Sequence, residues 1–315
     1  MTMTPRPLGS TGLEVTPLCV GTSPLASMPR LYGYDVSDER AVATIEAVLD
    51  SPIRFIDTSN GYGEHGEAEK RIGLALAARG GLPADVVLAT KVDPDPVTGD
   101  FSGKRVLASY EESLERLGVD RVPLLYLHDP ERISFEEAVA PGGAVEALVR
   151  LRDEGRVDYI GVAGGPVRLL AQYLETGKFD ALLSHNRYTL LDRSAQSLFA
   201  TARQRGIGVV NAAPFGGGML AKGPDVQSKY GYGERDERIA DAARAMAAAC
   251  ARHEVPLPAA ALQFSLRAPF IDATVVGVSS PERVDQTLEY AGLEIPEGLW
   301  AELETMVPPS DFWLD

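Results

Sequence analysis

The fold is decided by Val86-Val-Leu-Ala-Thr-Lys91, an amphipathic segment over Gly103–Leu117, and then Leu124-Leu-Tyr-Leu-His128. Both apolar runs are short and continuous rather than alternating, as expected of strands buried on both faces of a parallel sheet. The segment between them has helical spacing and stops at Gly118, where glycine can adopt the left-handed conformation that ends a helix. The unit is therefore strand, helix, strand.

The same unit recurs along the chain. The apolar runs are Leu18–Gly21, Arg54–Asp57, Val86–Lys91, Leu124–His128, Tyr159–Val162, Ala181–Ser184, Gly208–Asn211 and Thr274–Gly277. Helical patterns include Asp38–Leu49, Ala68–Ala78, Gly103–Leu117, Gly143–Glu154, Ala195–Arg205, Glu234–His253 and Leu257–Leu266. Strand followed by helix, eight times over, predicts an α/β fold of the (β/α)8 TIM-barrel type. No linker or compositional break divides the chain, so we expect one domain over residues 1–315.

The alternative is an open, doubly wound sheet, which needs a glycine-rich phosphate loop after an early strand. The nearest candidate, Gly21-Thr-Ser-Pro, lacks the GxGxxG spacing. The barrel is favoured, with long loops at its carboxyl-terminal face.

Composition narrows the possible partners. The formal net charge is −15, a field that repels nucleic acid and anionic membranes. No stretch approaches the roughly 20 apolar residues that span a bilayer, and the first residues lack signal-peptide character. Cys19 and Cys250 stand among apolar residues without metal or redox spacing, which predicts buried free thiols. We expect a cytoplasmic protein with a small-molecule substrate, no nucleic-acid partner and no membrane partner, in an oligomeric state that the sequence leaves open.

Ionisable residues end three consecutive predicted strands. Asp57, Lys91 and His128 occupy these positions, and Tyr62 follows the first of them in the turn Asn60–Gly63. Catalytic groups of such barrels gather at the carboxyl ends of the strands, so the four should share one pocket. A tyrosine is a poor base at neutral pH unless a nearby ammonium favours its phenolate. Each residue alone has an ordinary structural explanation, and their joint occurrence in strand order is what predicts catalysis.

These residues resemble the aldo-keto reductase family. The similarity is carried by Phe55–Gly63, Ala89-Thr-Lys91, Leu125-Tyr-Leu-His128 and Glu69–Gly73, and Leu8–Thr22 resembles the family's N-terminal β-hairpin and first strand. The resemblance implies Tyr62 as general acid/base, Lys91 and Asp57 as the groups that tune it, and His128 as the residue that orients the substrate. It also implies NAD or NADP in the barrel mouth and no metal. The four histidines have no metal-ligand spacing.

Several positions depart from the family's usual pattern. Ala163-Gly164 replaces the Ser-Asn that holds the carboxamide, His185 replaces a Gln, and Ala212 stands where an aromatic stacks on the nicotinamide. Gly277 stands where an NADP-specific member often has a lysine, although Arg283 remains. NAD, or use of both cofactors, is therefore expected over strict NADP use.

The remaining predicted contacts come from loops. The cofactor-binding candidates are Gly21, Thr22, His185, Asn211, Pro214, Phe215, Gly217, Gly277, Ser279, Ser280 and Arg283. The substrate candidates are Tyr32, His65, Asn186 and Arg187. The segment Lys222–Gly233 is expected to cover the cofactor, and Phe312–Asp315 is a candidate substrate or interface segment.

The substituted pattern resembles the subgroup that oxidises aldoses such as L-fucose, L-galactose and D-threo-aldoses at C1, with pyridoxal 4-dehydrogenase close by. The working hypothesis is NAD(P)-dependent oxidation of a sugar to its lactone. The enzymatic alternatives are a pyridoxal 4-dehydrogenase and a general NADPH-dependent aldehyde or ketone reductase. The alternative of another class is a cofactor-sensing regulatory subunit, against which the complete set of four catalytic residues argues.

Overall fold

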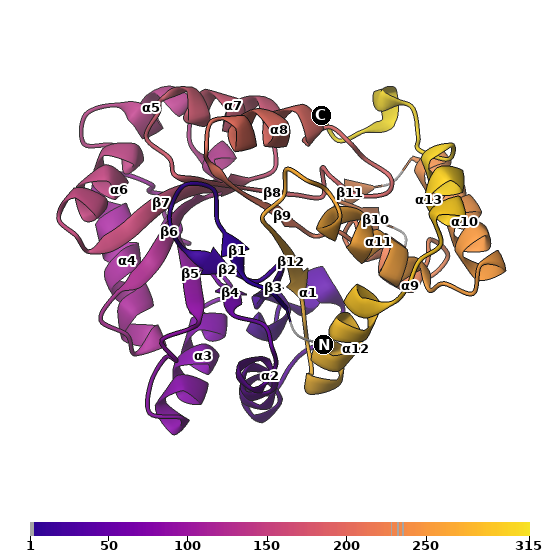
Figure 1. The fold of residues 1–315 in the computed structure, drawn as a ribbon. Helices are drawn as coiled ribbons and strands as arrows, with labels where there is room; N and C mark the ends of the chain where they lie inside the picture. Colours follow the sequence, from indigo (N-terminus) through magenta and orange to yellow (C-terminus); the bar gives the residue numbers. More distant parts are fainter. Residues whose placement is uncertain (1–2, 228, 232, 235) are drawn as a thin grey trace.

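The computed structural model describes residues 3–227, 229–231, 233–234 and 236–315. Eight parallel strands form a closed barrel in which the last strand pairs with the first (Figure 1). The strands are β3 (Leu18–Gly21), β4 (Phe55–Asp57), β5 (Val87–Val92), β6 (Val122–His128), β7 (Val157–Gly164), β8 (Ala181–His185), β9 (Gly208–Ala212) and β12 (Ala273–Gly277). The predicted (β/α)8 barrel is confirmed, and each strand ends within two residues of the predicted run.

Helices surround the strands on the outside (Figure 1). The principal ones are α2 (Asp38–Asp50), α3 (Glu67–Ala78), α4 (Gly103–Leu117), α6 (Ala144–Asp153), α7 (Val167–Glu175), α8 (Gln196–Gln204), α10 (Glu237–Arg252), α11 (Leu257–Leu266), α12 (Pro281–Gly292) and α13 (Glu297–Glu304). Shorter elements are α1 (Pro29–Tyr32), α5 (Phe135–Val139), α9 (Met219–Lys222) and the 3-10 turns Ser23–Ala26, Pro130–Arg132 and Ser310–Phe312. No helix among the described residues combines the length and apolarity needed to cross a bilayer.

One predicted boundary is wrong by three residues. The helical pattern begins at Glu234, whereas α10 begins at Glu237. Glu234 instead pairs with Lys229 in a hairpin of β10 (Lys229–Tyr230) and β11 (Gly233–Glu234). Asp236 caps the helix, because its carboxylate accepts a hydrogen bond from the amide of Arg238.

The barrel interior follows the two-residue period of a strand. On β5 the inward side chains are Val87, Ala89 and Lys91, whereas Leu88 and Val92 pack in the larger core cluster, which includes residues of the surrounding helices. The other end of the barrel is closed by the N-terminal hairpin of β1 (Arg6–Pro7) and β2 (Glu14–Val15). Leu8 and Val15 of this segment are fully buried in the same cluster as Cys19. Both cysteines are buried and free, as predicted.

Helices α3 and α4 pack at a close approach that depends on one glycine. A β-carbon at Gly73 would overlap the carbonyl oxygen of Arg116. Gly73 has no left-handed φ angle, so the requirement is for space alone. This contact bears on the barrel mouth because the loop that holds Tyr62 leads into α3 and is hydrogen-bonded to α4.

We predict that Gly73→Ala lowers the free energy of unfolding by about 1–3 kcal/mol, since the added methyl group forces the two helices apart. The matched control is Gly298→Ala in α13, where a β-carbon would meet nothing within 4 Å. The control should leave stability unchanged or slightly raised, because alanine favours a helix. Urea unfolding monitored by circular dichroism measures both. Equal midpoints for the two variants would show that the close approach carries no energetic weight.

Candidate active site

Strand periodicity places the three ionisable strand-end residues inside the barrel. Asp57 lies two residues beyond inward-facing Phe55, and Lys91 two beyond Ala89. His128 follows inward-facing Tyr126 by the same interval. The three therefore form the uppermost inward positions of β4, β5 and β6, at the carboxyl end of the barrel.

Lys91 is the centre of this group, with a side chain only 1% exposed. Its ammonium donates hydrogen bonds to Asp57 Oδ2 at 2.7 Å, to the carbonyl of Thr58 at 2.7 Å and to the hydroxyl of Tyr62 at 3.0 Å. Burial raises the pKa of the Asp57 carboxyl, although the Lys91 ammonium opposes that rise. The sequence placed Asp57, Tyr62 and Lys91 in one pocket, and the structure brings them into direct contact.

The loop that carries Tyr62 is anchored from below by Asn60. The Asn60 side-chain amide donates to the carbonyl of Ser109 at 3.0 Å and to Glu112 Oε2 at 3.1 Å, both on α4. Arg116 donates to the carbonyl of Asn60 at 3.2 Å. The position of the Tyr62 hydroxyl therefore depends on how α4 packs beneath the barrel mouth.

His128 completes the predicted set. Its ring lies edge-on to that of Tyr62, with centroids 5.5 Å apart and planes at 79°. Nδ1 lies 2.8 Å from Asp93 Oδ1 and 3.0 Å from Ser59 Oγ. Because Ser59 donates its hydroxyl hydrogen to Asp93, the imidazole donates from Nδ1 toward these two oxygens. Nε2 is then the nitrogen left to face a substrate.

Asp93 is a functional residue that the sequence reasoning missed. It is 2% exposed, and it also accepts a hydrogen bond from the amide of Gly61 at 2.8 Å. Burial alone would raise its pKa, but His128, Ser59 and that amide outweigh burial and lower it. Burial would likewise lower the pKa of His128, yet Asp93 and Asp129 together raise it. The available signal was its position two residues beyond Lys91, on the same side of the chain.

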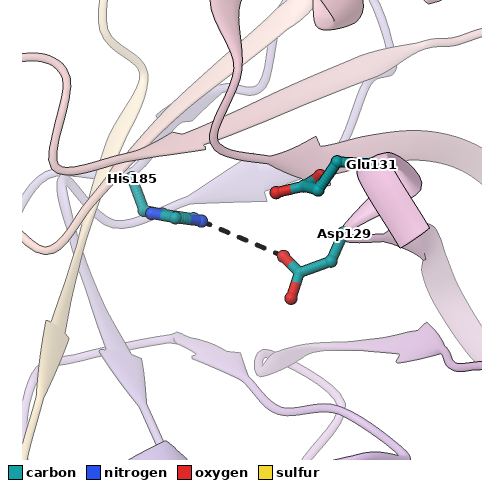
Figure 2. A group of neighbouring side chains, drawn as sticks. All are labelled: Asp129, Glu131 and His185. Carbon is teal, nitrogen blue, oxygen red and sulfur yellow. Dashed lines mark ion pairs between the residues drawn. The ribbon is translucent and has the colours of Figure 1, made fainter. Parts of the chain in front are cut away.

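A second acidic group lies on the other side of His128. Asp129 Oδ1 is 3.9 Å from His185 Nε2 (Figure 2). The same oxygen is 3.6 Å from His128 Nε2, and Oδ2 accepts from Arg132 at 3.1 Å. One ligand atom each from Asp129, Glu131 and His185 lies within 4.8 Å of the others, a grouping that could hold a metal ion. The cation Arg132 opposes a dication at this point. The expectation that no metal is used stays a prediction.

A cavity of about 300 Å³ opens beside the barrel mouth, between the loop after β9 and the start of α12. Its lining includes six predicted residues, namely Phe215, Gly217, Gly277, Ser279, Arg283 and Tyr32. It also includes Arg30 and Gln286, which the sequence did not predict. From the segment Lys222–Gly233 it includes Lys222, Gln227 and Lys229, whereas Ser228 and Tyr232 lie outside the described residues.

This cavity fits the phosphate-bearing part of a nicotinamide cofactor. Four cationic side chains, Arg30, Lys222, Lys229 and Arg283, line it in a protein of net charge −15. Ser280 lies at the N-cap position of α12, without a side-chain cap hydrogen bond, and Pro281 begins the helix, so the helix N-terminus lies beside Ser279 of the cavity lining. Positive charge and helix amides are the groups that bind phosphate.

Other predicted cofactor contacts are not among the residues that line this cavity. Thr22 is fully buried and donates to the carbonyl of Asp57 at 3.1 Å, directly after Gly21 at the end of β3. Asn211 is fully buried, bonded to Tyr188 and Ser265, and its Oδ1 has no partner. His185 faces Asp129, while Pro214 and Ser280 are buried beside the cavity lining. Their roles in cofactor binding stay predictions.

The predicted substrate residues separate in the structure. Tyr32 lines the cofactor cavity and bonds to Ser23 Oγ at 2.8 Å. His65 is exposed beside the Glu67 carboxylate, and Asn186 is fully buried against His185. Arg187 pairs with Asp315 at 2.5 Å, which fastens the C-terminal tail beside β8. The structure does not gather these four into one pocket.

A parallel barrel with clustered ionisable groups at its mouth and a cationic cavity beside them has the arrangement expected of a nicotinamide-dependent oxidoreductase. The chain belongs to the Aldo/keto reductase family, which its sequence matches over residues 17–307. Members of this family use nicotinamide cofactors.

Similarity to individual proteins extends over nearly the whole chain. The sequence is 36% identical to D-threo-aldose 1-dehydrogenase from Pseudomonas sp., covering 96% of this chain and 97% of that protein. It is 32% identical to L-galactose dehydrogenase from Arabidopsis thaliana (96% and 94% covered) and 31% identical to pyridoxal 4-dehydrogenase from Microbacterium luteolum (95% and 96%). These relatives confirm the predicted subgroup. In structure it resembles an aldo-keto reductase from Bacillus halodurans in its holo form, with a TM-score of 0.79 at 24% identity and 97% coverage of each chain, which supports the fold.

We predict that Asp93→Asn lowers the pKa of His128, because the carboxylate that favours its imidazolium is lost. The ionised Asp93 contributes to stability above the ordinary aspartate pKa, and the protonated His128 contributes below the ordinary histidine pKa. The difference in the free energy of unfolding between the wild type and the variant should therefore be largest between about pH 4 and 6.5. It should fade as the pH rises through the raised pKa of His128. NMR titration of the four histidines measures the shift, and Asp95→Asn, at a half-buried carboxylate two residues further along the chain, is the control. An unmoved His128 resonance in Asp93→Asn would contradict the assignment.

Proposed function

We propose that this protein oxidises an aldose at C1 to the corresponding lactone, using NAD or NADP. The observation that carries the proposal is the contact of one buried ammonium, Lys91 Nζ, with both Asp57 Oδ2 and the hydroxyl of Tyr62. Asp57 supplies the opposite charge that an ammonium at this depth requires. The charge in turn favours the tyrosine phenolate, which is the form able to accept a proton.

In this reaction Tyr62 takes the proton of the C1 hydroxyl group. His128 donates a hydrogen bond from Nε2 to the same oxygen and so fixes the C1–H bond in the direction of transfer. The nicotinamide cofactor, when bound, supplies the hydride acceptor. Asp93 favours the protonated form of His128 and orients its ring through Nδ1. Positioned acids and bases of this kind contribute about 10²- to 10⁴-fold in rate.

The choice of an aldose is supported by the relatives. Two of those named above act, by their names, on D-threo-aldoses and on L-galactose, and these sugars share the same arrangement of the C2 and C3 hydroxyl groups. The polar mouth formed by His128, Asp129 and His185 suits a substrate rich in hydroxyl groups. A second candidate substrate is pyridoxal, favoured by the 31% identity to pyridoxal 4-dehydrogenase.

We expect the site for the adenosine end of the cofactor to accept both NAD and NADP. Gly277 provides no cation there, which disfavours strict NADP use. Arg283 hydrogen-bonds to Gln286 at the edge of the cavity, where its guanidinium could pair with a 2′-phosphate or lie on adenine. The buried free thiols suit a reducing cytoplasm as the place of action.

We predict that Tyr62→Phe lowers turnover at least about 100-fold, because the proton acceptor is removed while its ring is kept. Cofactor affinity, measured by calorimetry, should stay near the wild-type value. The matched control is Tyr173→Phe on α7, which removes a buried hydroxyl without a hydrogen-bond partner and should leave turnover unchanged. A near-normal rate in Tyr62→Phe would refute the mechanism.

The substrate proposal is tested by initial rates on a panel. L-Fucose, L-galactose and pyridoxal are assayed with NAD⁺ and with NADP⁺, and simple aldehydes with NADPH. The proposal expects sugar oxidation with either cofactor at comparable efficiency. Turnover of pyridoxal or simple aldehydes, with both sugars inert, would replace it by one of the other two activities.

A further inference from the structure

Asp129 lies at a bend that directs its side chain across the barrel mouth. It follows His128 directly and adopts the left-handed conformation, with φ 41° and ψ 60°. This conformation is uncommon for residues other than glycine, although Asp and Asn tolerate it best. The Asp129 amide donates to the carbonyl of Ala163 at 2.7 Å, which holds the bend against β7.

The carboxylate lies beside the nitrogen that faces the substrate. Since Asp93 and Ser59 occupy Nδ1 of His128, only Nε2 is left for the reacting oxygen. Asp129 Oδ1 is 3.6 Å from that nitrogen, farther than a hydrogen bond, and its side chain is 22% exposed. In Figure 2 the side chains of His185 and Asp129 point toward one another, and Glu131 lies off the line that joins them.

Geometry then decides what Oδ1 can reach. When His128 Nε2 holds an oxygen on one carbon, a hydroxyl group on the next carbon lies about one hydrogen-bond length from that oxygen. A carboxylate accepts hydrogen bonds and donates none, so it favours a hydroxyl group over a carbonyl oxygen or a hydrocarbon. His128, His185 and Arg132 outweigh the effect of burial and lower the pKa of Asp129, so it is ionised at neutral pH.

We propose that Asp129 is a specificity residue, which accepts a hydrogen bond from the hydroxyl group on the carbon next to the reacting carbon, C2 of an aldose. The proposal rests on the proposed function, because it assumes that the reacting oxygen is held by Tyr62 and His128. It makes the protein selective for α-hydroxy substrates over those that lack this hydroxyl group.

The test compares two sugars that differ in one hydroxyl group. D-Arabinose and 2-deoxy-D-ribose are identical except at C2, where the second sugar carries only hydrogen. For the wild type and Asp129→Asn, kcat/KM is measured with both sugars. Asn keeps the left-handed backbone conformation, so the variant is expected to fold. The ratio of the two kcat/KM values should fall about 10- to 100-fold, because D-arabinose loses a hydrogen bond to a charged acceptor. A loss that acts through His128 is common to both sugars and leaves the ratio unchanged.

The control is Glu131→Gln, which changes a neighbouring carboxylate that accepts from the amide of Gly165 at 3.4 Å instead. It should keep the wild-type ratio. Equal losses for both sugars in Asp129→Asn would overturn the proposal, since Asp129 would then act only through His128. An unchanged ratio without losses would overturn it as well.

Failure of the proposed function gives a different result. In that case the wild type oxidises neither sugar, and the same ratio is measured in the direction of reduction with glycolaldehyde and acetaldehyde. These two aldehydes differ in the same hydroxyl group. A ratio lowered only in Asp129→Asn supports the role of Asp129 independently of the sugar, and an unchanged ratio overturns it.

Discussion

A lysine ammonium buried inside a barrel must be compensated, and the site is built around that requirement. Removing a charge from water costs several kcal/mol unless hydrogen bonds and an opposite charge replace the water. Asp57 Oδ2 and the Thr58 carbonyl supply those groups to Lys91, and Tyr62 supplies a third. The compensation is not complete, because Asp57 Oδ1 is buried without a hydrogen-bond partner. The ion pair therefore orders the tyrosine at some cost in stability, as functional sites often do.

The outer helices set the geometry of this pair indirectly. Thr90, next to Lys91 on β5, faces outward and donates to the fully buried Glu69 of α3 at 2.6 Å. Glu69 lies 3.4 Å from Arg116 of α4, and Arg116 also holds the carbonyl of Asn60. A chain of contacts thus joins the outward face of β5, the strand that carries Lys91, to the loop that carries Tyr62. The motif around Glu69 therefore supports the strand of Lys91 and the loop of Tyr62 from outside the barrel.

The fold and the clustering of Asp57, Lys91 and His128 could be predicted from the sequence because both follow from strand periodicity. Residues two apart share a face, so Asp57, Lys91 and His128 could be placed together without coordinates. Asp93 was missed because it lies one residue beyond the end of β5, and Asp129 because a left-handed bend, and not the strand period, directs its side chain. The loop contacts were predicted least well. Arg187 is drawn to Asp315, and such long-range pairing has no local signal.

The central claim is that the Asp57–Lys91 pair controls proton transfer at Tyr62, and the pH dependence of kcat/KM in Asp57→Asn tests it most directly. Without its counter-charge the buried Lys91 favours the neutral amine, and the phenolate loses its nearest cation. For oxidation we expect the rising limb of the profile to move to higher pH in the variant, with a lower rate at neutral pH. A profile that coincides with that of the wild type would contradict the account.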